Sequence, residues 1–291
     1  MAYPNVSAGY GLRAINELGG LPYAGSTRML PIASGYATNL FYGDIVILSG
    51  GTIVANSYTA ASSPTTPIAG TIGIFVGCEY TPASGPIYGK LRSQYWAAST
   101  VADDAVAYVI DDPRTVFKVA VGSQATSSLS NTSSGMGYMS PNFIGTNVYP
   151  LSGTAGSTTT GDSALVVSGG VVTNGTGNTR VTAAAPFRVV GMVQDSAVTV
   201  TATGSTSGSS TTVTLTAANS SIQAGMQLVC PTGTGSAAGK YITVTNVNGV
   251  TLTVSSAVTL ASGSALTFVG YPEVRVIWNG NFHSYNNTTG V

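Results

Sequence analysis

The sequence predicts an all-β protein with a β-barrel or β-sandwich core domain that carries an inserted, small Ig-like β-sandwich domain. Short runs rich in Val, Ile, Thr and aromatic residues recur between turns rich in Gly, Ser and Pro, as in barrels and sandwiches. Two of these runs, Pro186–Ala197 and Tyr271–Tyr285, alternate with the period of two that is typical of half-buried strands. The roughly seventy residues between them have a different composition, with Lys240 as their only charged residue.

This change of composition indicates a module inserted into the connection between two paired strands. We therefore expect residues 1–196 plus 271–291 to form the core β-domain, and residues 197–270 to form the inserted Ig-like β-domain. A chain of 291 residues is long enough to bury two hydrophobic cores.

The first 28 residues are expected to be an extended N-terminal arm, because their glycines and prolines disfavour a helix beyond one turn. The arm has too much apolar surface to remain in water, yet ordering it costs about 1–2 kcal/mol per residue. We therefore expect the arm to contribute little to the fold of its own domain and to become ordered against a neighbouring molecule. The expected assembly contacts are Tyr3, Tyr10, Leu12, Ile15, Leu18 and Tyr23.

The rest of the core domain is predicted to contain short strands joined by turns. Glycines within the run Gly70–Tyr80 indicate a bulge or a close approach of backbones. Residues 124–162 lack a regular pattern and are expected to form a long loop. The expected strands are Arg28–Ile32, Asp44–Leu48, Thr52–Ala55, Gly70–Tyr80, Tyr88–Tyr95, Ala105–Ile110, Val116–Val121, Leu165–Val172 and Thr179–Ala183.

The insert is predicted to contain six short strands, and the Asn248-Gly249 pair between two Thr- and Val-rich runs predicts a tight hairpin. No Cys–Trp–Cys pattern of a true immunoglobulin domain is present. The expected strands are Val198–Ala202, Thr211–Leu215, Met226–Val229, Tyr241–Val247, Thr251–Val254 and Ala265–Val269.

The charge composition argues against nucleic acid as a partner. Ten basic residues balance ten acidic ones, and the basic residues are dispersed along the sequence, whereas phosphate binding needs a clustered basic excess. No apolar run reaches the roughly twenty residues of a membrane helix, so no membrane partner is expected. A nearly neutral chain is poorly protected against association. We expect a homo-oligomer, with a trimer favoured and a dimer as the alternative.

The residues that could carry chemistry are few, so we expect no enzymatic activity, no cofactor and no metal site. His283 is the only histidine and is expected to serve packing or to lie at the surface. The GDSAL run at Gly161–Leu165 resembles a hydrolase nucleophile block but lacks a following helix and an Asp-x-x-His pair.

The remaining candidates have structural interpretations. The acidic pairs Asp103-Asp104 and Asp111-Asp112 are expected to cap turns, with Ca²⁺ binding as the alternative. Cys78 and Cys230 are expected to be two buried free thiols, in preference to a disulfide between the domains.

Several blocks in order resemble a family of virion structural proteins of tailed phages, commonly encountered in phages of marine bacteria. The blocks in the first part of the chain are AYPNVSAGYGLRAINELGG, GSTRMLPIASGYATNLFYGDIV, GIFVGCEYTPASG and VADDAVAYVIDDPRTVFKV. The two closing blocks are the FRVVG-like strand at Phe187–Gly191 and the EVxVxxNxNxHxY pattern at Glu273–Tyr285. The insert lies between the two closing blocks, where the family has a short connection, and its Thr- and Val-rich pattern is similar to Ig-like modules of phage structural proteins.

The resemblance implies a capsid decoration (cement) protein that binds the major capsid protein and stabilises the shell against the pressure of packaged DNA. It implies a location on the outer surface of the virion, after synthesis in the cytoplasm of the bacterial host, and it transfers no catalytic residue. The alternative is an adhesion protein whose insert binds host-surface glycans through Tyr241 and the Thr-rich loops. A major capsid subunit is disfavoured, because no segment has the amphipathic pattern of a long helix.

Overall fold

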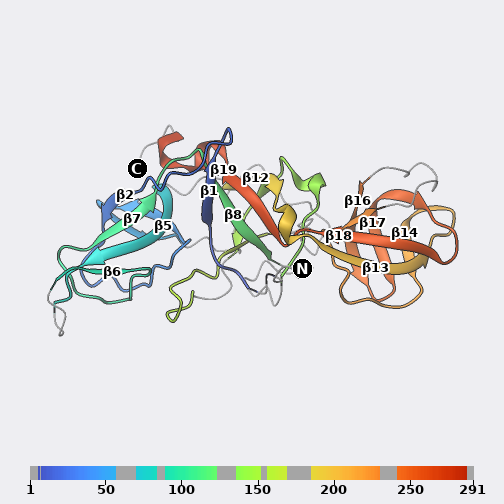
Figure 1. Cartoon of the computed structure of the whole chain (residues 1–291), viewed down its shortest axis with the longest axis horizontal. Coiled ribbons are helices and arrows are strands. Elements are labelled where there is room, and N and C mark those ends of the chain that lie inside the picture. The colour runs from blue at the N-terminus through green and yellow to red at the C-terminus, as the bar shows by residue number, and fades with distance from the viewer. Residues whose placement is uncertain are drawn as a thin grey trace.

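A computed structural model describes residues 6, 8–56, 70–83, 89–122, 136–151, 156–168, 185–229 and 241–286. Strands dominate these residues, which confirms the all-β class, and the helical pieces are short 3-10 turns. Three β-structures follow one another along the long axis of the molecule (Figure 1). Within the described ranges, no helix is long and apolar enough to span a membrane.

The first β-structure is a six-stranded sheet that nearly closes on itself. Its main path runs β2-β7-β5-β3-β4, β6 pairs with β5, and a parallel bridge between Ile32 and Ile53 joins the two ends of the path. Trp96 and Phe75 are fully buried at its centre. The strands are β2 (Arg28–Pro31), β3 (Ile45–Ser49), β4 (Thr52–Ala55), β5 (Thr71–Tyr80), β6 (Leu91–Ser93) and β7 (Val106–Ile110).

The second β-structure is a seven-stranded sheet in which the end of the chain pairs with distant segments. Its main path is β10-β11-β8-β19-β12-β9, and β1 also pairs with β8. Phe117, Phe187 and Val276 belong to its core, which also includes Ile45, Ile74 and Ile110 of the first sheet. The strands are β1 (Arg13–Glu17), β8 (Thr115–Gly122), β9 (Asn147–Val148), β10 (Pro150–Leu151), β11 (Val166–Ser168), β12 (Phe187–Met192) and β19 (Glu273–Trp278).

The N-terminal segment belongs to this sheet, so the expectation that it contributes little to the fold is wrong. Arg13–Glu17 form β1, antiparallel to β8, with a bulge at Ile15. Leu12 is completely buried in the shared core. The segment is ordered because β8 supplies hydrogen-bond partners that no local pattern in residues 12–18 reveals.

The third β-structure is a closed barrel of six strands, β13-β14-β17-β16-β15-β18. The insert was expected to be an Ig-like sandwich, but β18 pairs with both β13 and β15 and thereby closes the ring. Closure satisfies the hydrogen bonds of every strand and leaves no open edge. The strands are β13 (Val198–Ser205), β14 (Ser209–Leu215), β15 (Gln227–Val229), β16 (Tyr241–Asn248), β17 (Thr251–Thr259) and β18 (Ser264–Gly270).

The strand predictions for the insert are confirmed in number and order. The hairpin between β16 and β17 is also confirmed, with Gly249 at a φ of 58°, a conformation that glycine adopts without strain. In the core, the strand expected at 88–95 is shorter, at Leu91–Ser93. The strand expected at 165–172 is described only as far as Ser168, where Val166–Ser168 form β11. The expected strand Thr179–Ala183 and residue Cys230 lie outside the described residues. Cys78 is a buried free thiol, as expected.

The barrel lies against a specific segment of the core in addition to its two chain connections. Met139 and Tyr271 exchange two backbone hydrogen bonds, of 3.0 and 2.8 Å. Ser140 Oγ lies 3.2 Å from Thr243 Oγ1, and the Asn142 amide donates to the same oxygen at 2.9 Å. Residues 139–142 therefore brace the end of the barrel that faces the core.

The described residues also contain the short 3-10 turns η1 (Pro141–Phe143), η3 (Gln194–Ser196), η5 (Gly280–Phe282) and η6 (Ser284–Asn286). The last two carry the chain from β19 back over the first sheet, at the upper edge of Figure 1.

Candidate assembly surface

The structure divides the six predicted contact residues between the interior and the surface. Tyr3 lies outside the described residues. Leu12 is buried, and Tyr10 and Tyr23 are half-buried against their own domain. Ile15 and Leu18 are exposed by 38% and 47% of their surface, respectively. Of the five described members of the predicted set, only Ile15 and Leu18 are placed for contact with another molecule.

Tyr10 is an internal anchor. Its hydroxyl donates to Glu273 Oε1 at 2.6 Å, and the Lys118 ammonium lies 3.3 Å from the same carboxylate oxygen. Burial raises the pKa of Tyr10, and the neighbouring Glu273 carboxylate raises it further. The phenol therefore stays protonated and joins the N-terminal segment to the start of β19.

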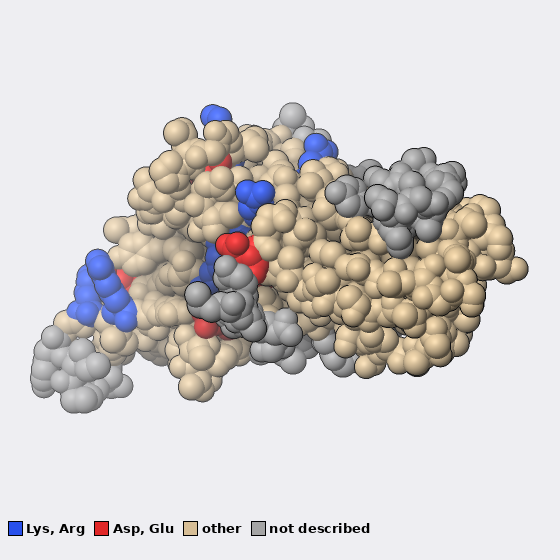
Figure 2. Space-filling view, turned by 45° about the vertical axis from the view of Figure 1, so that its right-hand side comes forward, with Lys and Arg blue, Asp and Glu red and all other residues tan. Residues whose placement is uncertain are grey.

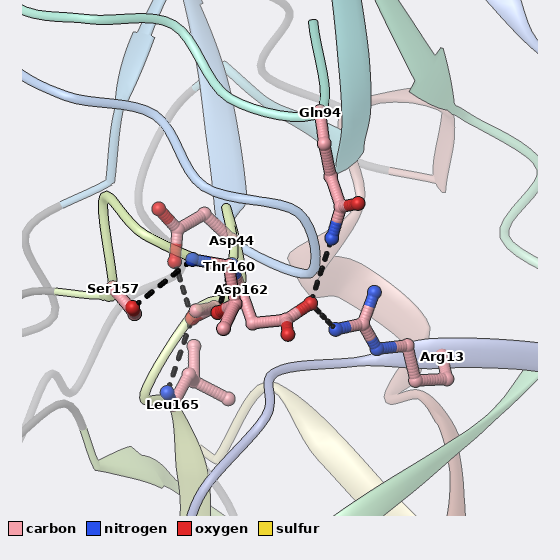
Figure 3. A network of polar contacts seen from close by, with 8 residues as sticks. Arg13, Asp44, Gln94, Ser157, Thr160, Asp162 and Leu165 are labelled. Carbon is pink, nitrogen blue, oxygen red and sulfur yellow. Dashed lines mark hydrogen bonds and ion pairs between the residues drawn. The ribbon is translucent and has the colours of Figure 1, made fainter.

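Arg13 forms a second anchor (Figure 3). Its guanidinium donates to Asp162 Oδ1 at 2.5 Å and stacks 3.9 Å above the centre of the Tyr42 ring. Gln94 donates to the same carboxylate oxygen at 2.8 Å. A cation over an aromatic face, with a charge-assisted hydrogen bond to a partly buried carboxylate, holds three chain segments together.

The GDSAL run lies in this network. Ser163 is 2% exposed, and its hydroxyl donates to Asp44 Oδ1 at 2.5 Å while accepting from the Leu165 backbone N–H at 3.0 Å. Burial raises the pKa of Asp44, an effect that the hydrogen bonds from Ser163 and the Phe41 N–H oppose. The Ser163 hydroxyl thus joins the loop before β11 to the turn before β3.

The expectation that the paired acidic residues cap turns holds for Asp112, whereas Asp104 and Asp111 bind residues far away in the sequence. Asp104 accepts hydrogen bonds of 2.8 Å from both the backbone N–H and the hydroxyl of Thr81, and these bonds lower its pKa. Asp112 accepts from the Arg114 backbone N–H at 2.8 Å. Among the described residues, no group of three or more His, Cys, Asp or Glu side chains could hold a metal ion.

Three segments that carry exposed apolar side chains meet at the turn between β7 and β8. The Leu18 N–H donates to the Arg114 carbonyl at 2.9 Å, and the Tyr285 hydroxyl donates to Asp111. Arg28, next to Met29, lies 3.5 Å from the same Asp111 carboxylate. We give the name assembly surface to the exposed apolar residues of these segments, which are Leu18, Leu21, Met29 and Tyr285, exposed by 47%, 64%, 62% and 50%.

Sequence reasoning missed three residues of the assembly surface. The alternation in β2, where Leu30 is buried and its neighbours are exposed, was the available signal for Met29. No local pattern marks Leu21 or Tyr285, because the segments around residues 18 and 285 come together only in the fold, at the turn 111–114.

The barrel has a surface of a different kind. Residues 198–229 and 241–270 include no Asp, Glu, Lys or Arg, and Figure 2 shows charged side chains over the core but none over the barrel. Of the large hydrophobic side chains that are exposed in the described residues, only Val250 belongs to the barrel. Among the described residues, exposed large hydrophobic side chains are therefore concentrated on the core.

No protein-family model, no curated protein and no solved structure matches this chain.

Proposed function

We propose that this protein is a non-enzymatic decoration protein of a phage capsid, bound to the outer face of the shell through its core. The observation that carries the proposal is the separation of surfaces: the assembly surface lies on the core, and the barrel is free of charge over its described residues. The resemblance of the core blocks to tailed-phage virion proteins agrees with this role.

On a capsid lattice, a modest contact between each copy of the protein and the shell is sufficient for stable attachment. Exposed apolar patches rimmed by polar groups typify protein–protein contact sites. Many copies on one shell add their binding energies, so each contact needs only a modest area. The partner is the major capsid protein, and the barrel points away from the shell.

The direct test is binding to capsids that lack this protein. Addition of the protein is expected to give saturable binding, new density at symmetry-related positions on the outer surface, and greater resistance of the shell to heat. The double variant Leu18→Ser/Leu21→Ser is expected to weaken binding several-fold, whereas the matched control Val250→Ser on the barrel keeps it. Absence of saturable capsid binding would overturn the proposal, and binding to host-cell glycans that requires the barrel would favour the adhesion alternative.

The proposal includes closed self-association, with a trimer favoured and a dimer as the alternative. Sedimentation at micromolar concentration is expected to show a single closed oligomer. A monomer in solution combined with asymmetric density on particles would contradict it.

A further inference from the structure

The only histidine of the chain lies against Tyr285, one residue of the assembly surface. His283 is completely buried, with its ring in edge contact with Trp278 at 5.4 Å and Tyr285 at 4.9 Å between centroids. Its Nδ1 accepts a hydrogen bond of 3.3 Å from the backbone N–H of Tyr285. Since an accepting nitrogen carries no proton, this arrangement requires a neutral ring with its proton on Nε2. Nε2 is buried and, among the described residues, has no hydrogen-bond partner of normal geometry.

Tyr285 connects this buried ring to the surface. Its hydroxyl donates to Asp111 Oδ2 at 2.5 Å and accepts a hydrogen bond from Arg28. The turn η6 is thereby held on β2 and on the β7–β8 turn, which also carries Leu18 through Arg114. The position of η6 thus determines the placement of Tyr285, and the β7–β8 turn connects it to the segment that carries Leu18.

Protonation would disturb this arrangement in two ways. A protonated imidazole has donors on both nitrogens and cannot accept from the Tyr285 N–H. A buried cation without an adequate partner is also costly. Burial lowers the pKa of His283, while the Ile72 backbone carbonyl and the charges of Asp111 and Asp112 oppose this shift.

We propose that His283 is an acid-sensitive latch: its protonation releases η6 from Asp111 and Arg28 and disorders the assembly surface around Tyr285. The charged and titratable groups around the latch are Asp111 and Asp112 on the β7–β8 turn, Arg28 on β2 and Tyr285 itself. Detachment from the capsid in acid is a consequence that rests on the proposed function, whereas release of η6 does not.

The sign of the effect follows from linkage. A released His283 titrates near its ordinary value of about 6.5 and binds its proton at a higher pH than the buried ring does. The latched state is therefore favoured above about pH 6.5 and loses its advantage as the pH falls toward the lowered value. Each unit of difference between the two pKa values multiplies the released population about tenfold.

Hydrogen exchange of residues 280–286 in the intact protein tests the latch. After correction for intrinsic exchange, these amides are expected to exchange faster at pH 5.0 than at pH 7.5, together with a change in Trp278 fluorescence. In His283→Asn, the amide oxygen takes the acceptor position without titrating, and the pH dependence is expected to disappear. Tyr108→Phe, which removes a phenol–carboxylate hydrogen bond to Glu79 elsewhere, is the matched control and keeps the response.

Two results would overturn the latch: equal protection at both pH values in the wild-type protein, or an unchanged pH response in His283→Asn. If that variant does not fold, an NMR titration of the single imidazole decides, with a pKa below 6.5 expected and one at or above 6.5 overturning the latch. Capsid binding then separates the two proposals. Binding at pH 7.5 that weakens at pH 5.0 in wild type but not in His283→Asn supports both, whereas no binding at either pH rejects only the decoration role.

Discussion

At the scale of single residues, close approach of backbones restricts Gly73 in β5. A Cβ atom built at this position would lie 2.1 Å from the Ile110 carbonyl oxygen of the paired strand β7. Glycine is needed here because the obstacle is backbone, which cannot move aside as a side chain can.

Overpacking a core costs about 1–3 kcal/mol, and we expect Gly73→Ala to lower the free energy of unfolding by the upper part of this range. Chemical denaturation measures it. Gly280→Ala is the matched control, since an added Cβ there meets nothing within 4 Å. Equal losses in the two variants would contradict the role of close approach.

Burial also determines the reactivity of Cys78. The thiol is 1% exposed, and burial raises its pKa to about 12. In a Cys230→Ser background, we expect alkylation at pH 8 to be very slow in the native protein and rapid after denaturation, because the thiolate is the reactive form. Mass spectrometry follows the reaction. Rapid labelling of the native protein would show that this part of the sheet opens readily.

At the scale of elements, the pairing of β1 with β8 makes the N-terminal segment part of the core domain. Leu12 is buried in the core that the two sheets share, whereas Leu21, nine residues later, is 64% exposed. The same short segment therefore contains a structural residue and a surface residue.

Leu12→Ala is expected to cost about 2–5 kcal/mol of stability, as in other buried leucine truncations. Leu21→Ala is expected to stay within about 0.5 kcal/mol, as for an exposed position. Thermal melts of the isolated protein measure both. Removal of residues 2–21 is likewise expected to lower the melting temperature. An unchanged melting temperature would instead support an arm that becomes ordered only against a partner.

At the scale of the whole molecule, the barrel interrupts a pair of strands that remain neighbours. β12 and β19 pair from Phe187–Trp278 to Met192–Val274, and the Val193 N–H donates to the Glu273 carbonyl at 3.2 Å. The ends of the insertion are therefore close enough for a short turn to join them.

Replacement of residues 197–270 by a short Gly/Ser linker is expected to leave a soluble core with a cooperative melt. A modest loss of stability is expected, because Ser140 and Asn142 lose their partner Thr243. The double variant Ser140→Ala/Asn142→Ala in the full chain is the control for that loss. An insoluble or unfolded core after the replacement would show that the barrel is part of the core's own folding unit.

Local patterns in the sequence were sufficient for the all-β class, for the six strands of the insert and for the Asn248-Gly249 hairpin. Period-2 alternation and turn chemistry depend on neighbouring residues, so the sequence alone displays them. Apolar character in the N-terminal segment did not separate Leu18, which is exposed, from Leu12, which is buried.

Tertiary structure alone decided the rest, because it depends on pairing between residues far apart in the chain. The segment expected to be an arm forms β1, with a bulge at Ile15, because it pairs with β8. The insert is a barrel because β18 pairs with both β13 and β15. The assembly surface exists only because segments near residues 18, 29 and 285 meet at the turn 111–114. The local pattern of a strand is compatible with many pairing partners. Packing and barrel closure, which involve residues far apart in the sequence, determine which pairing forms.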